Sequence, residues 1–569
     1  MRHGPEVPGY SLTGTRAHAA PAALCFVVAA LLVGPAMLTA GGAVPGHPQG
    51  DTYEHLHGYA WVARRLAAGA LPWEAHDFGL PEGGVLWFPD MLGALLVLPV
   101  SLLAGAPVAY TLSTWLQVSG GLLGGYALGL RFGGGKATGL LAAAIFGASP
   151  YVMGLLHSGV SEYLHIGAFP LLWLASERAL GRGGRSIVVA GLLWAWLGWA
   201  SVYYALFGAF VPLLAWLTTR EVPFPLALRR MLGMAGVAGL LVLPVALAIG
   251  ASLDSGAAML RAESAPGWSW VFLPANDLAG FFIPGDQLFP DFRDAGNFGI
   301  RHVTYLGFVA LLCAAPEWRR WWRPLLLAGV LALGPSLHWR GQPVRVGGRF
   351  VPLPAALLWL PGSPFNAVHH PYRLSVLPML VLAAAAAAAL RNRPRLALAA
   401  GAAVLGETLL VSPGAGPTPT ASLDGAPELP EPGGVLDLPP DFRSYNRRWM
   451  GLQAVHGQPI AYTFNVFMPA PFRGNRVYQA AMDCLPRGWQ NTIARDARPP
   501  LGVWLVNDSP QSVSEGVDEL RRWGFRYVVV HGDVLAEAER ACLQELLRTG
   551  GATELPGRAE LPVFDLGSE

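Results

Sequence analysis

Charged residues are scarce in this chain. Only 13% of its 569 residues are Asp, Glu, Lys or Arg, whereas a soluble domain carries about 25%. Hydrophobic residues make up 53% of the sequence, and the mean hydropathy is +0.39. This composition excludes a wholly water-soluble globular protein and predicts an integral membrane protein.

An excess of either charge is also missing. The sequence has 39 Lys and Arg residues against 37 Asp and Glu residues, which leaves a formal net charge of +2. Nucleic-acid binding depends on an accumulation of positive charge. We therefore expect no nucleic-acid partner.

Cysteine is rare, and its spacing fits no zinc or redox motif. Cys25 and Cys313 lie in apolar segments, whereas Cys484 and Cys542 lie in the polar C-terminal part. The sequence contains no C-x-x-C motif. Cys484 and Cys542 either form a disulfide, if that part is exported, or stay unpaired, because no spacing rule decides between the two.

Long apolar segments dominate the first 412 residues. A helix needs about 20 largely apolar residues to cross a membrane. We expect about eleven spans, near residues 20–40, 107–130, 137–154, 167–181, 186–202, 203–218, 231–250, 304–316, 324–337, 372–390 and 396–412. The shorter run 91–103 predicts a juxtamembrane helix in the membrane interface.

Arg and Lys residues recur in every second turn between these spans. Such turns face the cytoplasm by the positive-inside rule. The basic turns are 131–136, 177–185, 219–230, 316–323 and 391–395. The pattern predicts a cytoplasmic N-terminus and places the loop 41–106 and the C-terminal part outside.

The composition changes after the last predicted span. Residues 413–433 are rich in Pro, Gly, Thr and Ala, which is typical of a linker. Residues 434–569 contain the strand-like segments 434–439, 527–530 and 561–566 and two amphipathic helical segments. We expect an all-α membrane domain over 1–412 and a small extracytoplasmic α/β domain over 434–569.

An acidic stretch follows the first predicted span. Asp51, Glu54 and His55 share one face of a helix at positions i, i+3 and i+4. Carboxylates beside a membrane are costly to leave charged and tend to mark substrate or ion sites. Asp51 can alternatively be the N-cap of this helix.

Other predicted outer loops add further carboxylates and bases. Glu162 is flanked by His157 and His165, and Arg301 and His302 end a long Pro- and Gly-rich loop. A carboxylate can take the proton of an attacking hydroxyl group, and an Arg can hold a phosphate leaving group. The alternative for Glu162 is a solvated loop position. His157 and His165 could also ligate a metal ion together with Glu162, but two histidines and one acid at these spacings are weak evidence for a metal site.

A third basic group precedes the tenth predicted span. His369, His370 and Arg373 lie in the segment FNAVHHPYRL. They can bind a phosphate group on the same outer surface. Alternatively, they anchor this segment beside lipid headgroups.

Several motifs in the first 190 residues resemble the GT-C superfamily of membrane glycosyltransferases. Asp51-Thr52-Tyr53-Glu54 is similar to the acidic motif that opens the first external loop in that superfamily. The turn 67–73, the helix 91–103 and the segment LGLRFGGGKATGLLAAAIFGASP follow in the expected order. The chain is most similar to large bacterial multi-span members, which share its Pro81-Glu82-Gly83 and Tyr305-Leu306-Gly307 motifs.

This resemblance implies roles for particular residues. Asp51 is implied to be the catalytic or metal-facing carboxylate, Glu162 a second acid, and Arg373 a group that faces the lipid phosphate. Two positions depart from the superfamily pattern: Thr52 interrupts the usual acid pair, and His369-His370-Pro371 replaces the first Arg of a late basic motif.

The resulting hypothesis is a glycosyltransferase in a bacterial inner membrane. It would move a sugar from a polyprenyl-phosphate donor to an extracytoplasmic acceptor, with inversion at the sugar carbon. Asp51, Glu54 and Glu162 would be catalytic. The residues expected to bind substrate are His55, His157, His165, Arg301, His302, His369, His370 and Arg373. A divalent metal ion is a candidate cofactor. The alternatives are a transporter of lipid-linked precursors and a non-catalytic assembly protein of the cell envelope.

Overall fold

The structure is a computed structural model of the whole chain. It describes residues 15–39, 41–48, 50–81, 83–219, 221–254, 276–284, 304–340, 342–360, 362–368, 370–411, 418–439, 445–462, 471, 474–485, 512–557 and 560–567. Arg301, His302 and His369, which we expected to bind substrate, lie outside these residues.

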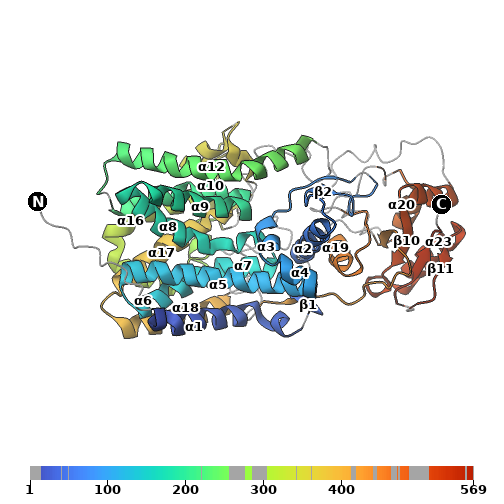
Figure 1. The fold of residues 1–569 in the computed structure, drawn as a ribbon, viewed down its shortest axis with the longest axis horizontal. Coiled ribbons are helices and arrows are strands. Elements are labelled where there is room, and N and C mark those ends of the chain that lie inside the picture. The colour runs from blue at the N-terminus through green and yellow to red at the C-terminus, as the bar shows by residue number, and fades with distance from the viewer. Residues whose placement is uncertain are drawn as a thin grey trace, which may run out of the picture.

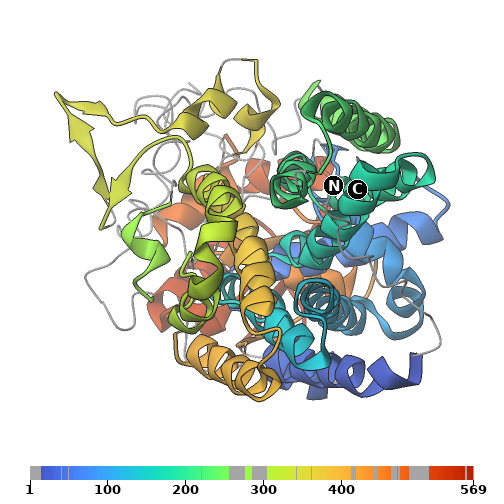
Figure 2. The ribbon, with the colours of Figure 1, turned by 90° about the vertical axis from the view of Figure 1, so that its left-hand side faces the viewer.

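A bundle of helices forms one end of the elongated molecule, and a small sheet domain forms the other (Figure 1). The bundle helices are α1 (Thr15–Val33), α5 (Ala106–Gly133), α6 (Lys136–Gly147), α7 (Pro150–Ser158), α8 (Ala168–Arg182), α9 (Arg185–Ala200), α10 (Val202–Gly208), α11 (Phe210–Thr219), α12 (Phe224–Asp254), α15 (Phe308–Ala314), α16 (Trp318–Leu333), α17 (Val376–Ala389) and α18 (Pro394–Val411). Most of them run along the long axis and are seen nearly end-on in Figure 2.

Four described helical segments are long and apolar enough to cross a membrane. They are His18–Leu38, Phe224–Ala251, Pro371–Ala389 and Pro394–Val411. The bent pair α6 and α7 makes a fifth if it counts as one broken span. The chain is therefore a multi-pass membrane protein, whereas the predicted number of eleven spans is not established.

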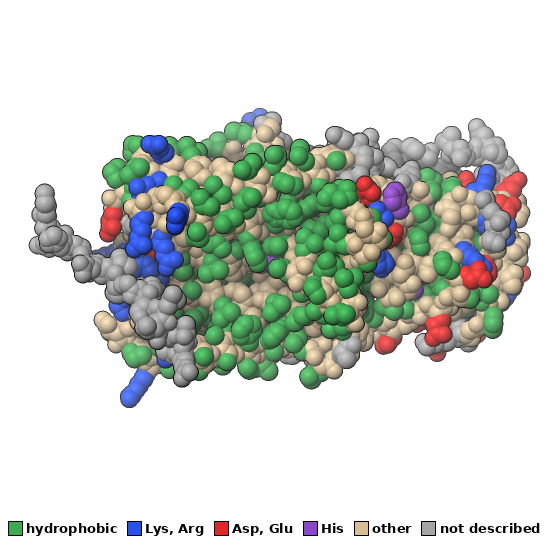
Figure 3. All heavy atoms as spheres, viewed as in Figure 1, with side chains coloured by type: hydrophobic (Ala, Val, Ile, Leu, Met, Phe, Trp, Pro, Cys, Tyr) green, Lys and Arg blue, Asp and Glu red, His purple; other side chains and the backbone are tan. Residues whose placement is uncertain are grey.

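The outer surface of the bundle matches a membrane environment. Hydrophobic side chains cover its middle, and Lys and Arg side chains gather at the end away from the sheet domain (Figure 3). Lys136, Arg182, Arg319 and Arg391 are exposed, and they lie in four of the turns predicted to be cytoplasmic.

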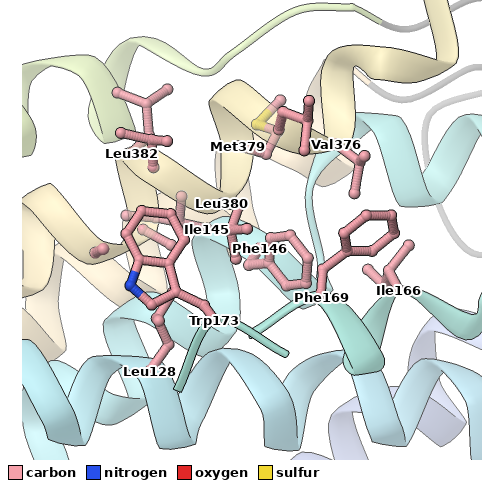
Figure 4. Close-up of a cluster of buried hydrophobic side chains, with 14 of the residues drawn as sticks. Leu128, Ile145, Phe146, Ile166, Phe169, Trp173, Val376, Met379, Leu380 and Leu382 are labelled. Carbon is pink, nitrogen blue, oxygen red and sulfur yellow. The ribbon is translucent and has the colours of Figure 1, made fainter. Parts of the chain in front are cut away.

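The alanine-rich helix α17 lies in the centre of the bundle. Its residues 376–387 are all buried. Small side chains let neighbouring backbones approach closely, which is how helices associate in membranes. Larger side chains fill the remaining space, as in the cluster that joins Trp173, Phe146 and Phe169 to Leu380 and Met379 (Figure 4).

Three short helices cover the end of the bundle that faces the sheet domain. Helix α2 (Thr52–Ala67) carries the acidic stretch, and α3 (Met91–Leu96) and α4 (Leu98–Ala104) form the predicted juxtamembrane helix in two pieces. Glu54 in the first turn and Arg64 and Arg65 in the last turn of α2 complement the helix dipole. A short hairpin of β2 (Glu74–Ala75) and β3 (Gly84–Val85) lies between α2 and α3.

The C-terminal domain has a four-stranded sheet in the order β11-β12-β10-β9. The strands are β9 (Gly434–Leu438), β10 (Phe525–Val530), β11 (Thr553–Glu554) and β12 (Val563–Asp565), and the helices are α19 (Tyr445–His456), α20 (Arg476–Asp483), α22 (Val513–Arg522) and α23 (Glu537–Thr549). Strands β9 and β10 are parallel, and the other pairs are antiparallel. The small sheet region that the sequence predicts at the C-terminal end is confirmed.

The segment predicted as a linker contains a strand. Residues Thr420–Ser422 form β8, which pairs antiparallel with β1 (Ala43–Pro45) directly after the first helix. Two further hairpins, β4 (His338–Trp339) with β5 (Gln342–Pro343) and β6 (Arg345–Val346) with β7 (Arg349–Phe350), project from one side of the bundle (Figure 2).

Cys484 and Cys542 form a disulfide that joins the end of α20 to α23. The sequence left open whether these two cysteines pair or stay unpaired, and the structure shows that they pair. The bond closes a loop with a sequence separation of 58.

We expect replacement of both disulfide cysteines by serine to destabilise the C-terminal domain. A loop of this length corresponds to about 4 kcal/mol of lost unfolded-state entropy. Limited proteolysis of the purified full chain at increasing temperature should therefore cut this domain at a lower temperature in the variant. Cys313→Ser, which removes a free thiol, is the matched control, and equal cleavage of all three proteins would contradict the expectation.

Candidate functional site

The start of α2 is held against the end of α7. The backbone N–H of Asp51 donates to the carbonyl of Ser158 at 2.7 Å. A Cβ atom on Gly50 would lie 2.4 Å from that same carbonyl oxygen, so glycine is required for this approach. The contact brings the acidic stretch beside the loop that follows α7 and carries Glu162.

Asp51 occupies the N-cap position of α2, but its side chain makes no capping hydrogen bond. Its Oδ1 atom instead lies 2.8 Å from Nη1 of Arg447, a residue of α19. Nε of the same guanidinium lies 3.2 Å from Oε1 of Glu54. One arginine of the C-terminal domain thus joins two of the three predicted catalytic carboxylates.

His55 and Glu162 form a buried pair. His55 Nε2 lies 3.1 Å from Glu162 Oε2, and its Nδ1 lies 3.0 Å from the Ser161 hydroxyl. Burial raises the pKa of Glu162 to about 8, the negative charges of Asp51 and Asp90 add to the rise, and the positive charge of Arg373 opposes it. Burial lowers the pKa of His55. A carboxyl group whose pKa lies near neutrality is suited to general acid–base chemistry.

Asp90 is the centre of a second, fully buried group. Its carboxylate accepts hydrogen bonds from Tyr59 at 2.6 Å and from the N–H of Gly93 at 3.1 Å, and His165 Nε2 lies 3.0 Å away. Burial opposes the anion, but the hydrogen bonds of His165, Ser161 and Tyr59 outweigh it and lower the pKa of Asp90. Because its lone pairs are occupied in this way, Asp90 anchors α2, α3 and the loop of His165 to one another.

Arg373 lies in a cage of tyrosines. Its guanidinium carbon is 3.7 Å from the ring centroid of Tyr163 and 5.5 Å from that of Tyr203, and its Nε donates to the Tyr372 hydroxyl at 3.3 Å. Among the residues that the structure describes, no carboxylate lies within ion-pair distance of this guanidinium. Cation–π contacts therefore hold a buried positive charge close enough to Glu162 to oppose the rise of its pKa.

The other predicted site residues lie at different positions. His157 is buried at the end of α7, and its carbonyl accepts from the N–H of His47 at 2.7 Å. His370 is partly exposed and contacts the ring of Tyr372. The structure thus brings Asp51, Glu54, His55, Glu162 and Arg373 into one cluster, while His165 belongs to the group around Asp90.

Sequence reasoning missed Arg447 as a site residue. The Arg447-Arg448 pair lies almost 400 positions after Asp51, in a domain that reads as soluble. The tyrosine cage was missed too, because its rings come from separate segments. The arginine doublet near the start of α19 is the one signal that the sequence offered.

The residues at this site do not fit a divalent metal ion. No group of three or more His, Cys, Asp or Glu residues in the described part of the chain has the geometry of a metal site. Asp51 and Glu54 face a guanidinium, and Asp90 faces His165. These carboxylates already have partners that the protein supplies, a guanidinium for Asp51 and Glu54 and an imidazole for Asp90.

We expect Glu162→Gln to change how stability depends on pH. Because the folded pKa of about 8 lies above the ordinary 4.5, the wild-type protein loses folding free energy as the pH rises from the lower value through the higher one. Glutamine does not ionise, so the variant should gain on the order of 5 kcal/mol relative to wild type over this interval.

Melting temperatures of both proteins in detergent, measured at acidic and alkaline pH, test this expectation. Glu74→Gln is the matched control, because Glu74 is an exposed partner of Arg65. Parallel pH curves for wild type and Glu162→Gln would contradict a raised pKa.

Comparisons with known proteins add one structural likeness. No family model matches the chain, and no curated protein sequence matches it. Among similar solved structures is the archaeal oligosaccharyltransferase AglB from Archaeoglobus fulgidus, in complex with an inhibitory peptide and a dolichol-phosphate. The match has 12% sequence identity and a TM-score of 0.41, and it covers 94% of this chain and 73% of that one. A likeness at this level assigns neither a family nor an activity.

Proposed function

We propose that this protein is a GT-C-type membrane glycosyltransferase that uses a polyprenyl-phosphate-linked sugar donor. The observation that carries the proposal is the buried Arg373 beside the Glu162–His55 pair. No carboxylate of the described residues lies within ion-pair distance of Arg373, and such a guanidinium can bind a phosphate through two hydrogen bonds. A neighbouring carboxyl group with a pKa of about 8 supplies the acid–base group.

The position of this pair suits a donor embedded in the membrane. Arg373 lies at the start of an apolar segment that is long enough to span the membrane, Pro371–Ala389. Helices α2 and α19 cover the same end of the bundle (Figure 1). A lipid phosphate at the membrane surface would reach the guanidinium, while an acceptor would approach from the side of the C-terminal domain.

Glu162 is better suited than Asp51 to be the general base. Protonating Asp51 would break its ion pair with Arg447, whereas Glu162 has the histidine partner and the raised pKa. In the proposed step, a hydroxyl or amine of the acceptor attacks the anomeric carbon and gives its proton to Glu162. The bond from that carbon to the phosphate oxygen breaks with inversion, and Arg373 holds the phosphate that leaves with the electron pair.

Asp51 and Glu54 then have an electrostatic role. Their carboxylates hold Arg447 and place negative charge beside the reacting sugar, whose ring becomes positively charged in the transition state. His55 orients Glu162 through the 3.1 Å contact. The location in a bacterial inner membrane, the cytoplasmic N-terminus and an exported C-terminal domain belong to the same proposal.

The structure does not favour the transporter alternative. Glu407 was the main charged residue within a predicted span and thus the main candidate for ion coupling. Its carboxylate accepts hydrogen bonds from the N–H groups of Phe308 and Val309 and from Tyr305. It therefore caps the start of α15 and has a structural explanation.

We expect Arg373→Ala to weaken binding of a polyprenyl-phosphate. Loss of a charged hydrogen bond costs about 1.5–3 kcal/mol, which corresponds to a decrease in affinity of roughly 10- to 100-fold. Binding to the purified protein in nanodiscs measures this directly. Arg391→Ala, at the opposite basic end of the bundle, is the matched control. Unchanged affinity in Arg373→Ala would contradict the proposed phosphate site at this residue.

Glu162→Gln should abolish sugar release but keep donor binding. The amide cannot accept the proton, so we expect a decrease in turnover of about 10²–10⁴-fold with little change in affinity. Release of labelled sugar from a polyprenyl-phosphate-sugar pool, measured beside Asp51→Asn, tests which carboxylate is the base. Full turnover in Glu162→Gln with loss in Asp51→Asn would assign the base to Asp51.

A further inference from the structure

Arg447 reaches the carboxylates of α2 from a different domain. It lies in α19, near the start of this helix, and its side chain is 13% exposed. The positive charge is shared between Asp51, at 2.8 Å, and Glu54, at 3.2 Å. The ion pairs raise the pKa of Arg447 despite its burial. The guanidinium is therefore a permanent cation between two acids.

The packing of α19 on α2 fixes this arginine in place. A Cβ atom on Gly451 would lie 2.2 Å from the ring of Tyr53, so the two helices touch at this glycine. Further along, Arg64 Nη2 donates to Gln453 Oε1 at 2.9 Å. The contacts of α19 with α2 at Gly451 and Gln453 thus hold Arg447 in place in addition to its ion pairs.

Asp51 and Glu54 lie one helical turn apart, and a pair of carboxylates at this spacing can bind a hard divalent ion between them. In this protein the guanidinium of Arg447 lies at that position. Here the cation is part of the chain. The other acids of the cluster also have partners from the protein, because Glu162 pairs with His55 and Asp90 with His165. A metal ion at Asp51 and Glu54 would have to displace Arg447 from both.

We propose that Arg447 takes the place of a divalent metal ion at Asp51 and Glu54, so that the site operates without a metal. This inference rests on the proposed function in treating these carboxylates as part of the reaction site. The C-terminal domain then contributes a positioning residue and completes the site. Its docking on α2 supplies the positive charge that sets the position of the two acids.

The test measures metal binding rather than turnover. Purified full-length protein in nanodiscs is stripped with EDTA, and bound Mn²⁺ is quantified by electron paramagnetic resonance. The variants are Arg447→Ala, Arg447→Lys and the double variant Arg447→Ala with Asp51→Asn. Arg448→Ala is the matched control, because the neighbouring Arg448 pairs with Asp533 instead.

We expect no stoichiometric Mn²⁺ on wild type, Arg447→Lys or Arg448→Ala. Arg447→Ala should bind Mn²⁺, and the double variant should lose it, because removal of the guanidinium exposes the acid pair. Stoichiometric Mn²⁺ on wild type that Asp51→Asn abolishes would overturn the inference, and so would a folded Arg447→Ala variant without metal. These results do not depend on Arg373 and Glu162, so they are distinguishable from failure of the proposed function.

Discussion

The contact between α2 and α19 is the interaction on which the candidate site depends. Asp51 and Glu54 are two largely buried acids at the start of α2, and an uncompensated buried charge is expensive. Arg447 from α19 compensates both of them through two ion pairs. Gly451 permits the close approach of the two helices. The C-terminal domain is therefore part of the site rather than an appendage on a linker.

The same electrostatic requirement explains how the remaining buried charges are arranged. Asp90 accepts hydrogen bonds from several donors, whereas the carboxyl group of Glu162 contacts His55 and has a pKa that burial raises to about 8. Arg373 is held by aromatic rings instead of a carboxylate. Two carboxylates of the same cluster thus differ in role because their partners differ: one is fixed as an anion, and the other can exchange a proton. This guanidinium, which has no ion pair to a carboxylate among the described residues, is what distinguishes a candidate reaction site from a structural ion network.

Several features of the site were within reach of sequence reasoning. The helical spacing of Asp51, Glu54 and His55 placed them on α2 correctly, and Glu162 and Arg373 were chosen because outer loops share one surface. Arg447 and the cage of Tyr163, Tyr203 and Tyr372 were not within reach, because their proximity depends on packing between distant segments. The predicted number of eleven spans stays unconfirmed, because several apolar helices, such as α9, are shorter than a single span needs and only tertiary structure can show whether they cross the membrane.

The sequence by itself determined the membrane character, the basic turns and the small C-terminal sheet domain, because composition and periodicity act locally and need no partner. Tertiary structure alone decided which acid carries a permanent countercharge and which is left with a shifted pKa. It also decided that Cys484 pairs with Cys542. The physical reason is that burial and ion pairing are properties of a site, and a site exists only after residues far apart in the chain have come together.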